Sequence, residues 1–324
     1  CHENNITFVY AIAPGLDISY SSKTDYNLLI AKINQLKNIG ANSLALLFDD
    51  IPEKMNETDE NVFDSFAQAH AIISNKIFSE TKLENYFFCP TVYCSDQSNV
   101  FINENDYLSE LSKLLYKEFN IFWTGTSVIS PEITSNHIQE LKKVFDHPIV
   151  IWDNLFANDY DLHRCFMGPF SGRDEIKDEV EGILLNPNCQ FELNYIPIHT
   201  FSSYCKNRQV DLQLSIKKWY TQFENVISID ELKLLIDVNY LPHQLGTKGI
   251  ELVEKLKSNN YDDFAQLSWD LLHKLAKLKN RDLFHVIYPF AWGLFANIKT
   301  HKDGFGVEFL PNTRIGTISY LINK

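Results

Sequence analysis

The sequence predicts an α/β fold, a (β/α) barrel followed by an all-α region, and three observations indicate it. Short apolar runs alternate with amphipathic segments of helical spacing in the first part of the chain. Polar residues follow directly where these apolar runs end, and only helix-period segments remain after about residue 200. Apolar runs that are continuous rather than alternating are typical of a parallel sheet, because both of its faces are covered.

Six apolar runs are predicted as strands, at residues 7–13, 43–48, 86–88, 121–123, 148–151 and 182–185. The crossover helices between the first five are predicted at residues 26–39, 62–78, 107–119 and 133–145. Strand, helix, strand at this spacing indicates parallel pairing, in either a closed barrel or an open doubly wound sheet. No Gly-x-Gly-x-x-Gly turn follows the first strands, and polar side chains end at least four different strands, so the barrel is favoured.

The later part of the chain is predicted as a small helical bundle. Its helices are expected at residues 212–223, 229–238, 249–256, 262–278 and 283–298. We therefore expect a barrel domain at residues 1–205 and a helical domain at residues 206–324. Trp219, Trp269 and Trp292 fall on the apolar faces of these helices, and we expect them mostly in the core.

Composition excludes several classes of function. The chain has 324 residues, 45% of them hydrophobic, which is enough for a large core. Its net charge of −13 repels phosphate backbones and argues against a nucleic-acid partner. Six scattered cysteines in a chain of this length indicate reduced thiols and a reducing compartment. Neither a membrane-spanning stretch nor a secretion signal is visible, so no membrane partner is expected.

The adjacent acids Asp49 and Asp50 are the strongest candidates for chemistry. They end the apolar run 44–48, where a buried charge without a partner would be costly. Two close carboxyls in a partly apolar pocket should have their proton affinities pushed apart, which suits glycoside cleavage. The alternative is a turn or a helix start capped by aspartate before residues 51–53.

Other polar clusters indicate less. The loop 154–161 could bind calcium or sugar hydroxyls, or simply form turns in which Asn and Asp side chains bond the backbone, and turn formation is the simpler explanation. Cys89 and Cys94 have no second cysteine pair and no nearby histidine, which argues against a zinc site. Without a histidine partner, Cys89 is a better candidate for a pocket wall than for a nucleophile.

Five ordered motifs resemble the signature segments of glycoside hydrolase family 84, and in particular its animal-type protein O-GlcNAcases. They are LLFDDI at 46–51, FCPTVYC at 88–94, WTG at 123–125, VIWDN with ANDYD within 150–161, and LNPNC at 185–189. YAIAPGLD at 10–17 also matches, and residues 234–249 are similar to the helical stalk of that family. The resemblance covers nearly the whole chain.

The resemblance implies an eight-stranded (β/α)8-type TIM barrel that removes β-linked N-acetylglucosamine from Ser and Thr of intracellular proteins. In that mechanism the 2-acetamido oxygen of the sugar attacks and forms an oxazoline, so no cofactor or metal is required. Asp49 would accept the acetamido N–H and polarise the group. Asp50 would be the general acid that protonates the leaving oxygen, and then the base that activates water.

The resemblance also implies a set of substrate-binding residues. Cys89, Tyr93 and Trp152 would form the walls of the acetamido pocket. Asn154, Asp159 and Asn186 would form hydrogen bonds with the acetamido group or the ring hydroxyls, and Tyr160 would lie near the aglycone. A homodimer through the stalk and a location in cytoplasm and nucleus are implied as well.

The chain departs from the family pattern at its start. Six barrel strands are predicted instead of eight, and the glycine and lysine sugar contacts of the family would precede residue 1. We therefore expect the natural protein to carry a further β/α segment upstream, or this chain to be an incomplete record of it. Two other functions stay open: a hexosaminidase for free glycans or hyaluronan-like polymers, and a non-catalytic glycan-binding protein on a decayed barrel.

Overall fold

The computed structural model describes residues 1–302 apart from 224 and 259, and the chain divides into two compact units. The first unit contains Cys1–Asp153 and Gly172–Leu184. The second contains Asn154–Ser171 and the chain from Leu185 onward. The division expected at residue 206 stays a prediction, and residues 303–324 of the predicted helical domain lie outside the described residues.

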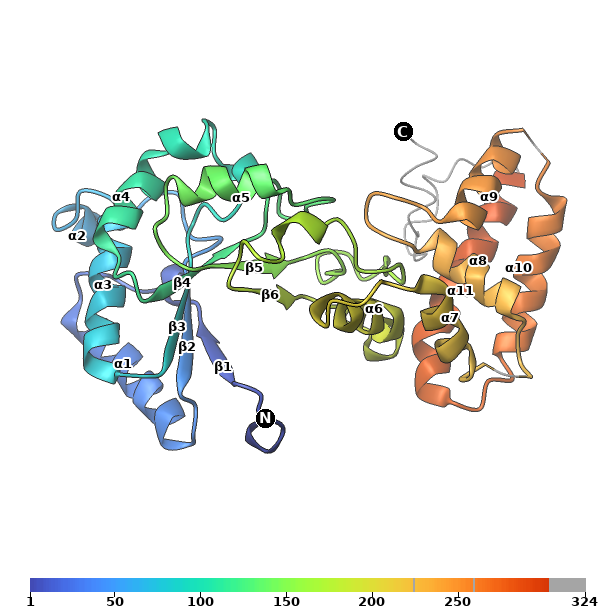
Figure 1. Ribbon diagram of the computed structural model, residues 1–324, viewed down its shortest axis with the longest axis horizontal. Coiled ribbons are helices and arrows are strands. Elements are labelled where there is room, and N and C mark those ends of the chain that lie inside the picture. The colour runs from blue at the N-terminus through green and yellow to red at the C-terminus, as the bar shows by residue number, and fades with distance from the viewer. Residues whose placement is uncertain (224, 259, 303–324) are drawn as a thin grey trace. The chain divides into compact units, whose positions relative to one another are not determined.

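The first unit is built on a six-stranded sheet whose strands lie in chain order (Figure 1). They are β1 (Val9–Ile12), β2 (Ser43–Leu47), β3 (Asn85–Cys89), β4 (Phe119–Trp123), β5 (Ile149–Asp153) and β6 (Gly182–Leu185). The first five pair in parallel, with Ala45 opposite Ala11 on one side and Phe87 on the other. Strands in unbroken chain order are the arrangement of a (β/α) barrel, since a doubly wound sheet reverses its order at a switch point. The predicted α/β class with a parallel sheet is thus confirmed. The sheet is curled into a half-barrel, and the eight-stranded barrel stays a prediction.

Helices follow the strands and cover the sheet (Figure 1). They are α1 (Lys23–Asn38), the short α2 (Glu57–Glu60), α3 (Phe66–Thr81), α4 (Asp106–Leu114) and α5 (Ser135–Lys142). The four longer helices each begin after a polar residue whose side chain accepts a backbone N–H three positions on; these residues are Ser22, Ser65, Asn105 and Thr134. Ile33 and Ile77 of the helices pack with Leu44 and Phe88 of the sheet in one buried cluster. Helical spacing therefore located the helices that cover the sheet.

Several helix bounds were predicted wrongly, and the helix expected at 62–78 spans Phe66–Thr81. The helix expected to reach residue 119 ends at Leu114, and the one expected at 133–145 spans only Ser135–Lys142. Leu115 and Phe119 are buried although they lie outside the helix, because Phe119 begins β4. Buried apolar residues thus stand on both sides of the exposed turn 116–118, so the apolar pattern does not mark where the helix ends.

The second unit is mainly helical. Its helices are α6 (Tyr195–Cys205), α7 (Leu212–Tyr220), α8 (Ile229–Val238), α9 (Thr247–Lys257), α10 (Asp262–Leu275) and α11 (Arg281–Lys302). Their apolar faces meet in one core that contains Leu232, Leu271 and Ile287. Trp219 is buried as expected, but Trp269 and Trp292 are 45% and 46% exposed, so their placement in the core was wrong.

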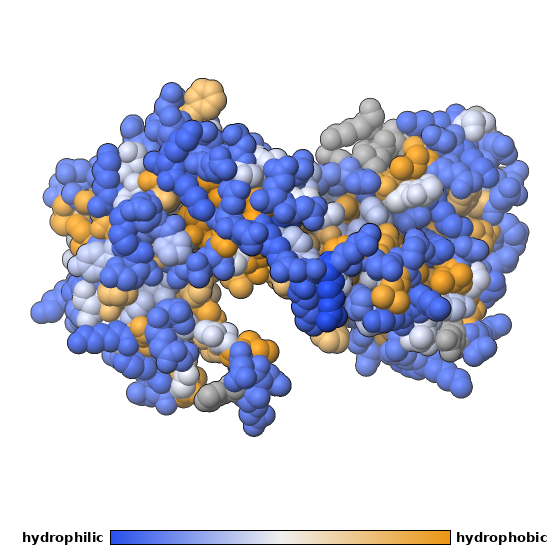
Figure 2. All heavy atoms as spheres, in the orientation of Figure 1, coloured by the Kyte–Doolittle hydropathy of each residue, from blue (hydrophilic) through white to orange (hydrophobic). Residues whose placement is uncertain are grey.

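Short 3₁₀ helices complete the connections of both units, at His2–Asn4, Pro14–Leu16, Ser95–Gln97, Ile102–Glu104, Asp174–Ile176 and Phe191–Asn194. The visible surface is mostly hydrophilic, with apolar residues in separate patches (Figure 2). None of the described helices is both long enough and apolar enough to cross a membrane.

Candidate active site

The two acids lie in a turn at the carboxyl end of β2. The strand ends at Leu47, and Phe48 leads into the turn that contains Asp49 and Asp50. Asp50 has a left-handed backbone with φ of 49°, which costs a residue with a Cβ about 1 kcal/mol or more. Neighbouring residues of a regular strand point to opposite faces, so this turn is needed before both carboxyls can serve one site. Asp49 is half-buried there, and Asp50 is exposed.

Three of the predicted pocket residues lie in the same unit as the acids. Cys89 ends β3 and is buried, Tyr93 follows in the next loop, and Trp152 belongs to β5. All three pack in one apolar cluster with Ala45, Phe122 and Val150. The Tyr93 hydroxyl donates to Oδ1 of Asp50 at 3.4 Å, a long hydrogen bond. The structure therefore brings an apolar wall and a phenol to the acidic turn.

The surroundings of Asp49, Cys89 and Tyr93 disfavour negative charge on these groups. Burial raises the pKa of Asp49, its own backbone N–H opposes the rise, and the neighbouring Asp50 adds to it. Burial and the two carboxyls likewise raise the pKa of the Cys89 thiol well above its ordinary value. Burial, and then Asp50, raise the pKa of Tyr93 to about 12. Cys89 and Tyr93 are therefore neutral at physiological pH, and neither is activated as a nucleophile.

One oxygen of Asp49 is left without a donor. Its Oδ1 is buried, and no described residue forms a hydrogen bond with it. Buried carboxyl oxygens are normally hydrogen-bonded, because burial of an unpaired acceptor costs about 1–3 kcal/mol. Such an unpaired acceptor is a place where a ligand N–H or O–H can bind.

The other predicted substrate residues belong to the second unit. Asn154 and Asn186 are half-buried, and the Asn186 amide donates to the Asn154 side-chain oxygen at 3.0 Å. Asp159 and Tyr160 are exposed in the loop that follows. Two neighbours of Asp159 show why the loop holds its shape. Asn158 is fully buried and bonds the backbones of Arg164 and Cys189, and Asp161 accepts from the backbone N–H two residues on.

Sequence reasoning missed the partner of Asp153. This aspartate ends β5 and is fully buried, with Arg173 donating to its two oxygens at 2.7 Å each. The same guanidinium also donates to the carbonyls of Ser130 and Pro131 at 2.8 and 2.9 Å. Arg173 lies in a loop twenty residues along the chain, and nothing in the sequence around it indicates this role. Asp153 is therefore committed to holding the fold.

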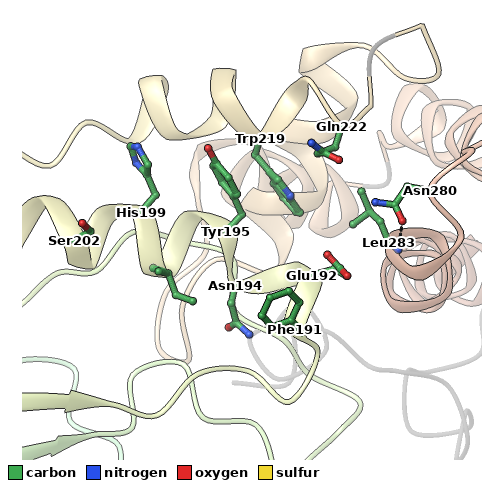
Figure 3. Close-up of a pocket in the computed structure, with 11 residues that line it drawn as sticks. Phe191, Glu192, Asn194, Tyr195, His199, Ser202, Trp219, Gln222, Asn280 and Leu283 are labelled. Carbon is green, nitrogen blue, oxygen red and sulfur yellow. Dashed lines mark hydrogen bonds between the residues drawn. The ribbon is translucent and has the colours of Figure 1, made fainter. Parts of the chain in front are cut away.

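The second unit has a cavity of its own, of about 540 Å³ (Figure 3). Tyr195 and His199 of α6, Trp219 of α7 and Leu283 of α11 line it. The ring nitrogens of His199 lie 2.9 Å from the Ser215 hydroxyl and 3.2 Å from the Lys218 ammonium. Burial, and then Lys218, lower the pKa of His199, so its ring is neutral. The described lining contains none of the residues predicted to bind substrate.

Comparisons with known proteins agree on one kind of enzyme. A family model described as NAGidase, beta-N-acetylglucosaminidase, matches residues 1–237. The Protein O-GlcNAcases of Rattus norvegicus and Mus musculus are each 42% identical to the chain over 207 residues, which is 63% of this chain and 23% of theirs. The chain thus spans about a quarter of the length of these relatives. A mutant of the Thermobaculum terrenum O-GlcNAc hydrolase has a similar fold, with a TM-score of 0.79 and 24% identity over 97% of this chain and 72% of that one.

Proposed function

Because this chain belongs to the NAGidase family of beta-N-acetylglucosaminidases, we propose that it carries the catalytic centre of a retaining glycosidase that removes O-linked N-acetylglucosamine from Ser and Thr of proteins. The observation that carries the proposal is the acidic turn after β2. There an exposed carboxyl stands beside a half-buried one with an unpaired oxygen, in the same unit as an apolar cluster that contains Cys89, Tyr93 and Trp152. The names of the rat and mouse relatives support the choice of glycosylated proteins as substrates.

The proposed mechanism is assisted by the substrate. The 2-acetamido oxygen of the sugar attacks the anomeric carbon, the bond to the aglycone oxygen breaks, and an oxazoline forms. The buried oxygen of Asp49 accepts the acetamido N–H, which becomes more acidic as the amide oxygen attacks. This hydrogen bond favours the ionised carboxylate and so opposes the effect of burial on the pKa of Asp49. Binding of the sugar thereby supplies the partner that this oxygen lacks.

Asp50 is proposed as the general acid and base. It protonates the departing serine or threonine oxygen, and it then takes a proton from the water that opens the oxazoline. Its exposure supports this role, because both the aglycone and the water must reach it. The Tyr93 hydroxyl donates a hydrogen bond to Asp50. When Asp50 is protonated, this hydroxyl can donate to the substrate instead.

The remaining residues are assigned by the resemblance. We propose that Asn154, Asp159 and Asn186 form hydrogen bonds with the acetamido group or the ring hydroxyls of the sugar, and that Tyr160 lies toward the aglycone. Two observations support this assignment. Asp159 and Tyr160 are exposed, and the Asn186 amide donates a hydrogen bond to the Asn154 side chain, so the polar groups of these two asparagines lie together. A pocket that pairs its polar groups only with the right sugar rejects others strongly.

We also propose the finer features of the family for the whole protein. The six strands would belong to an eight-stranded barrel, because a half-barrel leaves sheet edges open to unwanted pairing. The helices from α7 onward would form a stalk through which two copies pair. All six cysteines are free thiols, which supports a location in the reducing cytoplasm and nucleus.

One assay tests the proposed function. The full natural protein is incubated with a glycosylated protein, a chromogenic β-N-acetylglucosaminide and an oligosaccharide, and released N-acetylglucosamine is measured. Release from the protein and from the chromogenic sugar is expected. Preferential release from the oligosaccharide would favour the hexosaminidase of free glycans. Binding of sugar with no release from any substrate would favour the non-catalytic glycan-binding protein.

A further inference from the structure

The residue directly before the acidic pair is held from three sides. Phe48 is fully buried, and its backbone N–H donates to the Cys89 carbonyl at 3.0 Å. Its carbonyl accepts from the Thr91 hydroxyl at 2.8 Å. Its ring stacks on the His70 ring with centroids 4.1 Å apart and an angle of 24° between the planes. Backbone and side chain of Phe48 are therefore both fixed just before the chain turns into Asp49.

The groups that hold Phe48 are joined to each other by Tyr107 of α4. The Thr91 backbone N–H donates to the Tyr107 hydroxyl at 3.1 Å, and the same oxygen lies 3.1 Å from Nδ1 of His70. Nε2 of His70 lies 3.1 Å from the Tyr20 hydroxyl. The His70 ring is buried and neutral, so one nitrogen donates and the other accepts. A continuous hydrogen-bonded chain thus runs behind the turn from Thr91 to Tyr20.

The acidic turn needs such support. Asp50 is held in a left-handed conformation beside another carboxyl, and residues keep such backbones only where their surroundings determine them strongly. The Phe48 carbonyl belongs to the peptide whose nitrogen is that of Asp49, so the Thr91 bond fixes the plane from which the turn begins. The hydrogen bonds of Thr91, Tyr107 and His70 given above are formed with Phe48, Tyr20 and one another, so these residues act on the two carboxyls only through the backbone.

We propose that Thr91, Tyr107 and His70 are positioning residues, which set the direction of the Asp49–Asp50 turn and thereby align the two carboxyls with the sugar. This inference rests on the proposed function, since it assigns these residues to the acid–base step of that reaction. Misplacement of a reacting group by about 1 Å can lower a rate by about 10²-fold. Loss of one support should therefore lower kcat far more than it changes substrate binding.

The test compares Thr91→Val with Thr91→Ser in the full natural protein. Valine keeps the volume and removes the hydroxyl, and serine keeps the hydroxyl. We expect Thr91→Val to lower kcat by about 10-fold at nearly unchanged KM, with the pH–rate profile shifted. Thr91→Ser should restore both toward the wild type. Tyr107→Phe should have an effect in the same direction, because it removes the acceptor of the Thr91 N–H.

Matched controls lie elsewhere in the same unit. Thr81 and Tyr86 also bond each other through buried hydroxyls, at 2.7 Å, away from Phe48. Thr81→Val and Tyr86→Phe should lower thermal stability about as much as the test variants while kcat, KM and the pH profile stay as in the wild type. The proposal is overturned if Thr91→Val behaves like Thr81→Val, or if Thr91→Ser does not restore kcat.

A second measurement keeps the inference separate from the proposed function. The carboxyl carbons of Asp49 and Asp50 are followed by ¹³C NMR across pH, with Asp49→Asn and Asp50→Asn to assign them. Thr91→Val should move both resonances and their titration, whereas Thr81→Val should not. If the wild type releases no N-acetylglucosamine, the proposed function fails, while the NMR result still decides the positioning. Unmoved resonances in Thr91→Val overturn it.

Discussion

Two aspartates of the first unit, one at the end of β5 and one in the turn after β2, have opposite surroundings. At the end of β5, Asp153 is fully buried and both of its oxygens accept from Arg173. After β2, Asp49 is half-buried and has an oxygen to which no described residue donates. Burial of a carboxylate is tolerated only with partners. The paired aspartate therefore holds the fold, and the unpaired one is available for a ligand.

The largest effect is expected where the pair after β5 is broken. Arg173→Met would leave the Asp153 carboxylate buried without its cation, and removal of one partner of a buried ion pair costs about 3–5 kcal/mol. The free energy of unfolding, measured by urea denaturation, should fall by about that amount. The double variant Arg173→Met with Asp153→Leu should regain much of it, because apolar side chains need no partner. A single variant as stable as the wild type would show that Asp153 does not depend on Arg173.

The acidic turn should instead respond in activity. Asp50→Asn is expected to lower kcat by about 10²-fold or more on substrates with poor leaving groups, because it removes the general acid. With an activated phenol as leaving group the loss should be smaller, since that group departs with little proton transfer. Stability should change little, because Asp50 is exposed. An equal loss on both substrates would contradict the assignment of Asp50 as the acid.

These two strand ends also show how far sequence could go. Apolar runs located the six strands of the half-barrel, because continuous apolar runs are typical of parallel strands. The runs of β1 and β6 gave this signal although none of their residues is fully covered in the half-barrel. The same runs located the acids, since a carboxyl at the end of a buried strand is conspicuous. Both Asp49 and Asp153 have that pattern, so sequence alone could not separate them.

The missing information is three-dimensional. Arg173 reaches Asp153 from a distant loop, and the Thr91 hydroxyl reaches Phe48 across two strand ends. Neither contact has a local signature, because each depends on how the loops close. The left-handed backbone of Asp50 could not be predicted from the sequence either. Aspartate tolerates that conformation, but most aspartates do not adopt it. The exposure of Trp269 and Trp292 shows the same limit for helices, where an apolar face need not be a covered one.

Acid should destabilise the fold through His70, which supports the Asp49–Asp50 turn. Burial lowers the pKa of His70 from 6.5 to about 3. Between these values the unfolded chain binds a proton that the folded chain does not, so the stability present above pH 6.5 is lost as the pH falls toward about 3. Through this one group, the free energy of unfolding falls by about 1.4 kcal/mol for each pH unit in that range. His70→Gln should therefore make the fall in unfolding free energy shallower between pH 6.5 and pH 4.

Urea denaturation at several pH values measures the wild type and His70→Gln. If His70→Gln and the wild type lose stability in parallel, acid acts on another group and not on the ring that stacks on Phe48.

The smallest effect is expected for the stability of Asp49→Asn. Burial, and then the charge of Asp50, raise the pKa of Asp49 despite its own backbone N–H. For an acid shifted upward, the stabilising form is the protonated one, present below the unfolded pKa and lost as the pH rises through the folded pKa. Ionisation of Asp49 as the pH rises therefore disfavours the fold. Asp49→Asn should change the unfolding free energy by about 0.5 kcal/mol or less, in the stabilising direction, while activity falls.

The control is Asp153→Asn, which should lower the Tm clearly, because Arg173 would lose its counter-charge. Thermal unfolding of both variants at pH 7 decides the matter, since equal losses of Tm would mean that Asp49 holds the fold as Asp153 does.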